Sequence, residues 1–142
     1  MAMVLVIAGL TLSACTQVST ASGSKIQAAT VESIEGTSLH RVTLTAKAAK
    51  RLDIQTVPVR DAEIGGTQRK VIPYAAVIYR ADGSTWTYTS PQPLVFIRRP
   101  IMIDRIEGDM AILWDGPPSG TEVVTVGAAE LFGTESGVGG EH

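Results

Sequence analysis

The chain has 142 residues, of which 44% are hydrophobic and 18% are charged, and its net charge is −2. This length holds one modest domain, and the hydrophobic fraction argues against wholesale disorder. The weak negative charge argues against nucleic-acid binding, which depends on clustered lysine and arginine. A single cysteine, Cys15, excludes an internal disulfide and a cysteine-rich zinc site.

The chain begins with an apolar run over residues 1–12, MAMVLVIAGLTL, which has signal-peptide length and is short for a bilayer span. No lysine or arginine precedes it. The run ends in Leu-Ser-Ala-Cys at residues 12–15, which resembles the lipobox of bacterial lipoproteins. The resemblance implies a signal peptide over residues 1–14 and lipidation of Cys15. The alternative is a plain apolar leader followed by an incidental cysteine.

Residues 15–38 are rich in Ser, Thr, Ala, Gly and Gln and predict a flexible tether, although Val31, Ile34 and Leu39 could form a loose strand. The folded domain is expected over residues 39–133, and residues 134–142 are expected to form a disordered tail. Near the start of this domain, good helix formers predict a short helix over residues 46–52. Thr45 is its expected N-cap.

The next stretch reads as short strands separated by turns. Residues 55–60 alternate and contain a proline, which predicts an edge strand. Residues 61–68 predict a turn or link, and residues 71–80 a strand with a kink at Pro73. An Asp-Gly hairpin turn then leads into a strand over residues 85–90.

A proline-broken link over residues 91–93 precedes further strands over residues 94–106, 110–114 and 121–126. Residues 128–132 are expected to form a last strand or a helical turn. This pattern predicts a mainly β fold, a small β-roll or partly open β-barrel of about six or seven strands with one short helix. The largest expected core residues are Tyr74, Trp86, Phe96 and Trp114.

Three parts of the chain carry a resemblance to a known family. They are residues 42–59 (VTLTAKAAKRLDIQTVPV), residues 72–89 (IPYAAVIYRADGSTWTYT) and residues 95–131, which include a Gly-x-x-Val-Val-x-x-Gly-like segment from Gly120 to Gly127. In this order they are similar to the membrane-proximal part of periplasmic adaptor proteins, the membrane fusion proteins of efflux pumps of the resistance-nodulation-division type.

The chain departs from that family between residues 60 and 71. A full adaptor has a β-barrel, a lipoyl-like domain and an α-helical hairpin there, whereas this chain has little more than residues 61–68. The resemblance therefore implies the membrane-proximal domain alone. It implies a non-catalytic envelope lipoprotein, facing the periplasm or the cell exterior, that assists an efflux or export system. The expected partner is an envelope transporter or adaptor, and no cofactor is expected.

Five residues are candidates for partner docking: Trp86, Tyr88, Arg98, Arg99 and Trp114. The adjacent arginines could dock an acidic surface, or they could be an ordinary solvated edge. The aromatic side chains could contact a partner or stack on a sugar, or they could belong to the core.

Other chemistry has weaker support in the sequence. Acidic residues gather around one turn (Asp104, Glu107, Asp109 and Asp115), but their spacing matches no EF-hand loop, and His40 and His142 stand alone. We therefore predict no metal site. No nucleophile and base pair predicts an enzyme. The remaining alternative is an envelope lipoprotein that binds a small molecule, metal or glycan, and an exposed aromatic pair would favour it.

Overall fold

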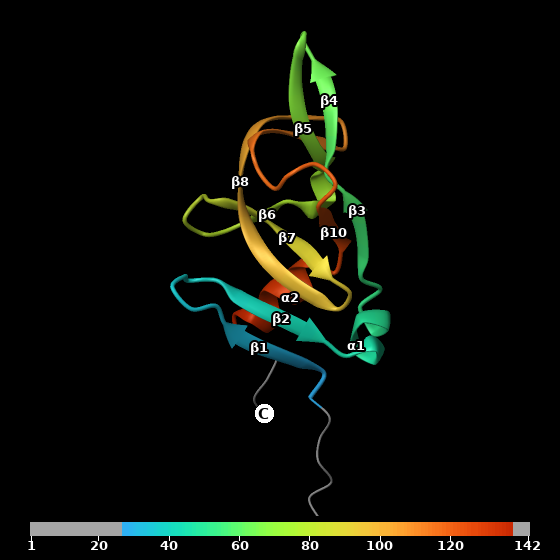
Figure 1. Ribbon diagram of the computed structural model, residues 1–142, viewed down its shortest axis with the longest axis vertical. Helices are drawn as coiled ribbons and strands as arrows, with labels where there is room; N and C mark the ends of the chain where they lie inside the picture. The colour runs from blue at the N-terminus through green and yellow to red at the C-terminus, as the bar shows by residue number, and fades with distance from the viewer. Residues whose placement is uncertain (1–26, 138–142) are drawn as a thin grey trace, which may run out of the picture.

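The structure is a computed structural model that describes residues 27–137 (Figure 1). The expected signal peptide and Cys15 lie outside these residues. Ten strands, two α-helices and one 3-10 turn follow in chain order. They are β1 (Ala29–Ser33), β2 (His40–Leu44), α1 (Ala46–Arg51), β3 (Gln55–Pro58), β4 (Arg60–Ile64), β5 (Thr67–Pro73), η1 (Tyr74–Ala76), β6 (Ile78–Tyr79), β7 (Thr85–Gln92), β8 (Val95–Glu107), β9 (Met110–Asp115), β10 (Glu122–Val126) and α2 (Ala128–Glu135).

One curled sheet organises the molecule. Its main path runs β3-β10-β7-β8-β9-β5-β4, with β1, β2 and β6 joined to it from the side. These seven antiparallel strands form an open half-barrel, so the predicted mainly β, partly open architecture is confirmed. The long strand β8 holds the two halves together, because its first part pairs with β7 and β2 and its last part with β9.

Each face of the sheet has its own apolar core. On one face α2 packs over β2, β7, β8 and β10 in a cluster that includes Tyr88, Phe96 and Leu131. On the other face, inside the curl, a second cluster includes Ile72 and Leu113. Burial on both faces explains why Thr87 is fully buried, although threonine is more often exposed.

The first helix follows the expectation from its sequence. The Thr45 hydroxyl accepts a hydrogen bond from Ala48 N at 3.1 Å, which confirms this residue as the N-cap. Lys50 and Arg51 lie in the last turn, where the helix dipole favours cations. The helix has only six residues, so packing against Leu44 and its neighbours must hold it.

The second helix begins at a sharp turn. Gly127 has a φ of +88°, in the left-handed region that glycine enters without strain. A Cβ at this position would also collide with Ile54 Cδ1. The helix then runs to Glu135, so the chain remains ordered beyond the predicted end of the domain at residue 133. The predicted tail over 134–142 is therefore wrong at its start, because Glu135 packs against the sheet.

Several other sequence predictions need correction. The predicted tether is too long, because residues 29–33 pair with β2 as strand β1. Val31 lies in this strand, as the sequence allowed, whereas Ile34 and Leu39 lie in the connection between β1 and β2. Residues 61–68 are not a plain link: they form most of the β4–β5 hairpin that projects at one end of the molecule (Figure 1).

The prolines at residues 91 and 93 do not break the sheet, since Gln92 pairs with Val95 around a tight turn. Trp114 and Tyr74 lie outside the core, with 58% and 45% of their surface exposed.

Candidate functional site

Strand pairing brings three of the predicted site residues onto one face of the sheet. Tyr88 of β7 pairs with Arg98 of β8, and Trp86 pairs with Pro100 two residues further on. Paired residues of antiparallel strands point to the same side, so the two aromatic side chains and the Arg98 guanidinium share one face. This is the face that α2 covers, so Tyr88 and Arg98 are buried and Trp86 is half-buried.

Glu135 brings these side chains together from the last turn of α2. It follows Leu131 by four residues, and this helical spacing turns both side chains toward the sheet. Its carboxylate Oε1 lies 3.1 Å from Arg98 Nη2 and 3.3 Å from His40 Nδ1. The Tyr88 hydroxyl donates to Oε2. We call His40, Tyr88, Arg98 and Glu135 the Glu135 cluster.

The Glu135 carboxylate depends on these partners. Its side chain is only 3% exposed, and a carboxylate in the last turn of a helix is opposed by the helix dipole. A buried charge is tolerated only when it is paired and hydrogen-bonded. Burial raises the pKa of the Tyr88 hydroxyl above its ordinary value, the hydrogen bond to Glu135 raises it further, and Arg98 acts in the opposite direction. The hydroxyl therefore stays protonated at neutral pH and remains a donor.

The Arg98 guanidinium is held by aromatic rings as well as by the carboxylate. Its Cζ lies 4.6 Å from the centroid of the Trp86 ring and 5.6 Å from that of Phe132. Its Nε and Nη1 are buried and have no hydrogen-bond partner among residues 27–137. The negative faces of the two rings partly compensate a cation that lacks these bonds. The Glu135 cluster thus fastens the end of α2 to β2, β7 and β8.

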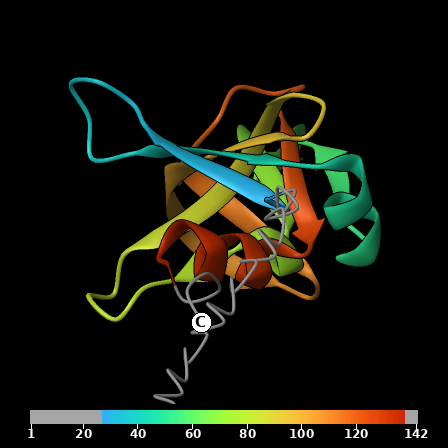
Figure 2. The ribbon, with the colours of Figure 1, turned by 90° about the horizontal axis from the view of Figure 1, so that it is seen from below.

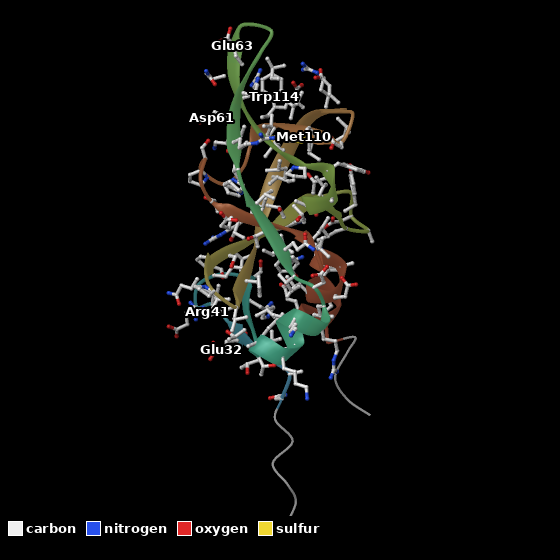
Figure 3. All side chains as sticks on the ribbon, turned by 90° about the vertical axis from the view of Figure 1, so that its right-hand side faces the viewer. Glu32, Arg41, Asp61, Glu63, Met110 and Trp114 are labelled. Atoms are coloured by element: carbon white, nitrogen blue, oxygen red, sulfur yellow. The ribbon has the colours of Figure 1, made fainter. Side chains whose placement is uncertain are left out.

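Trp114 forms an arginine–tryptophan contact of its own on the surface. It lies on β9, and the pairing of Lys70 with Leu113 places Arg69 of β5 beside it. Arg69 Cζ lies 3.7 Å from the centroid of the indole. Figure 3 shows Trp114 toward the end of the molecule that carries the β4–β5 hairpin, near Asp61. We call Arg69 and Trp114 the hairpin-base pair.

Arg99 lies apart from both contacts. Along β8 it points to the opposite side from Arg98, and it is exposed. It lines a hollow of about 400 Å³ together with Pro100, Pro117 and Pro118. The two adjacent arginines therefore do not act as one basic docking patch, because Arg98 is engaged in the core.

Sequence reasoning missed Arg69, His40 and Glu135 as site residues. For two of them a signal existed. His40 alternates with the buried Val42 and Leu44 along β2, and Glu135 continues the helical spacing of Ala128 and Leu131. Arg69 carries no such signal, because its neighbour Trp114 is 45 positions away and only the register of β5 and β9 joins them.

Metal-binding groups and membrane-spanning helices were sought among the described residues, and the whole chain was compared with known proteins. Residues 27–137 contain no group of three or more His, Cys, Asp or Glu side chains placed to hold a metal ion. Within the same residues, neither α-helix has the length and hydropathy needed to cross a bilayer. Comparison of the chain with protein-family models, with curated proteins and with solved structures found no match.

Proposed function

We propose that the chain is a membrane-anchored envelope lipoprotein whose β domain acts by protein–protein contact as an accessory or assembly component of an efflux or export system. The resemblance to periplasmic adaptors supplies the class of system, and the Leu-Ser-Ala-Cys segment supplies the anchor at Cys15. The partner would be an envelope transporter or another adaptor.

The observation that carries the contact role is the hairpin-base pair. Trp114 keeps 58% of its surface exposed although tryptophan is costly to leave in water, and Arg69 already stacks on it at 3.7 Å. Tryptophan and arginine dominate the energetics of protein interfaces. A ring that is ordered before binding loses less conformational entropy when a partner covers it. The hairpin-base pair therefore has the residue types of a protein contact site, and its tryptophan ring is already held in place before a partner binds.

The position of the pair supports the same conclusion. It lies by the β4–β5 hairpin, whereas β1, where the described chain begins, lies at the opposite end (Figures 1 and 3). If Cys15 anchors the chain, the hairpin end is directed away from the point of attachment. Residues 61–68, at which a full adaptor has its additional domains, belong to this hairpin.

The alternative of glycan binding finds no open site at Trp86 and Tyr88, because both lie on the face that α2 covers and Tyr88 is fully buried. An exposed aromatic pair does exist elsewhere: Tyr74 and Tyr79 are 45% and 54% exposed, with ring centroids 6.3 Å apart. The two rings meet edge to face at an interplanar angle of 61° and therefore do not form a flat stacking platform.

Site-specific crosslinking in the native envelope tests the contact role. A photo-crosslinking amino acid replaces Trp114 in one variant and Tyr79, which is 54% exposed on β6, in the control. We expect a discrete adduct with a transporter or adaptor at position 114 and none of that adduct at position 79. The same adducts at both positions, or none at 114, would contradict the proposal. Incorporation of labelled fatty acid, lost in Cys15→Ser, tests the anchor separately.

A further inference from the structure

An open groove lies at the end of the molecule opposite the β4–β5 hairpin. It is lined by the start of β1, the end of β2, α1 and its caps, and Thr134 in the last turn of α2, and it has a volume of about 470 Å³. Figure 2, seen from below, shows the start of β1 between these two helices. Its lining is mainly apolar: Ala28, Ala29, Leu44, Ala48 and Leu52. Leu44 belongs to the core beneath α2, so the groove opens directly onto that core.

Cations gather at the rim of this groove. Lys47 and Arg51 of α1 line it, and Lys50 lies on the same short helix. Among residues 27–137, no ion pair includes any of these three side chains. Like charges three or four residues apart destabilise an isolated helix by about 0.2–0.5 kcal/mol per pair. The nearest acid in the sequence, Asp53, accepts a hydrogen bond from Gln55 instead. The helix therefore concentrates positive charge without neutralising it.

The groove also lies where the N-terminal segment joins the domain. Ala28 and Ala29 form part of its wall, and the twelve residues 16–27 separate this wall from Cys15. Twelve residues span at most about 43 Å when fully extended. A chain held in a membrane at Cys15 would keep the groove within that distance of the lipid surface.

We infer that this groove binds an anionic phospholipid of the supporting membrane, with an acyl chain on the apolar wall and the phosphate between Lys47 and Arg51. Apolar area next to cations fits such a lipid because burial of the acyl chain and attraction of the phosphate act together. Each basic residue at an anionic surface contributes about 1 kcal/mol. The inference extends the proposed anchoring at Cys15 but does not require it.

Vesicle binding of the full chain carrying Cys15→Ser tests the groove without the lipid anchor. Partition is compared between vesicles of phosphatidylcholine alone and vesicles that also contain phosphatidylglycerol, so that the contribution of the apolar leader is common to both. We expect tighter binding to the anionic vesicles, reduced about fivefold by Lys47→Gln or Arg51→Gln. Arg60→Gln, which removes an exposed charge on β4, is the matched control and should change little.

A groove-filling variant separates the groove from general surface charge. Ala48→Met adds volume to the apolar wall and keeps every cation, and its thermal unfolding shows whether the fold is retained. Weaker anionic binding by the folded Ala48→Met protein supports the groove as the lipid site. Unchanged binding of this variant, or equal binding to both kinds of vesicle, would overturn the inference. If the unsubstituted chain incorporates no labelled fatty acid but the Cys15→Ser chain still binds anionic vesicles through the groove, the lipoprotein proposal fails and the groove proposal stands.

Discussion

Two of the three arginine–tryptophan contacts among residues 27–137, those of Arg98 and Arg69, have the same chemistry and opposite surroundings. The third, Arg80 over Trp86, is the longest at 6.0 Å. Arg98 stacks on Trp86 at 4.6 Å beneath α2, and its guanidinium also meets the buried Glu135 carboxylate. Arg69 stacks on Trp114 at 3.7 Å on the surface, and no ion pair among the described residues includes it. Both arginines lie on strands. What differs is that α2 covers the sheet face that carries Arg98, whereas the contact of Arg69 with Trp114 is open to solvent.

The difference determines which contact is used for folding and which remains for a partner. A buried guanidinium must keep its carboxylate, because an uncompensated charge in the core costs several kcal/mol. A cation over an exposed ring gains only about 0.5–1 kcal/mol, since water competes for both groups. The hairpin-base pair can therefore change partners at little cost, whereas the Glu135 cluster cannot.

Glu135→Gln should have the largest effect on stability. The change leaves the Arg98 guanidinium buried without an opposite charge, and we expect the free energy of unfolding to fall by about 3–5 kcal/mol. Chemical denaturation of the purified protein measures it. Glu130→Gln, on the exposed side of the same helix, is the control and should change stability by less than about 0.5 kcal/mol.

A double variant shows whether pairing is the cause. Replacing both charges with apolar groups, as in Arg98→Met with Glu135→Leu, should recover much of the stability that Glu135→Gln loses. An equal loss from Glu130→Gln and Glu135→Gln would mean that Glu135 is not specifically fastened to the sheet.

The Glu135 cluster also shows what could be foreseen from the sequence. Alternation along β7 and β8 and the turn residues between strands suffice to predict the strands, the hairpins and the half-barrel. The helix over residues 128–135 was missed in part because Gly133 lies within it, and glycine in a helix is read as an end signal. The sequence therefore predicts Glu135 in the tail.

The positions of the candidate site residues depended on information that one sequence does not carry. Arg98 and Arg99 look identical in the sequence, and which of them is buried depends on which face α2 covers. Trp114 was expected in the core because tryptophan is usually buried. In the structure Met102 pairs with Asp115 and Ile103 with Leu113, so Trp114 is the extra residue of a bulge in β9 and has no partner on β8. Its side chain is 58% exposed.

Tyr88→Phe should have an intermediate effect. Removing the hydroxyl leaves Oε2 of the buried carboxylate without its donor, which costs about 1–3 kcal/mol at neutral pH. Tyr79→Phe, at an exposed site, is the matched control. A similar small change in both variants would show that the Tyr88 hydroxyl does not support Glu135.

The same residue predicts an alkaline limit to stability. The pKa of Tyr88 is raised in the folded protein, so the folded chain keeps a proton that the unfolded chain releases above about pH 10. This contribution is complete below pH 10 and is lost as the pH rises, with a slope of up to about 1.4 kcal/mol per pH unit. Unfolding measured from pH 9 upward should show this slope, and it should be weaker in Tyr88→Phe.

The smallest effect on stability is expected at the hairpin-base pair. Arg69→Ala should lower the free energy of unfolding by no more than about 1 kcal/mol, because it removes only an exposed stack.

The chain has two tryptophans, so Trp86→Phe leaves Trp114 as the sole tryptophan and Trp114→Phe leaves Trp86. Iodide should quench Trp114 more strongly than Trp86, and Arg69→Ala should increase the quenching of Trp114 further as one ring face is uncovered. Equal quenching of the two tryptophans would mean that α2 does not shield Trp86, and the distinction between a contact for folding and a contact for binding would fail.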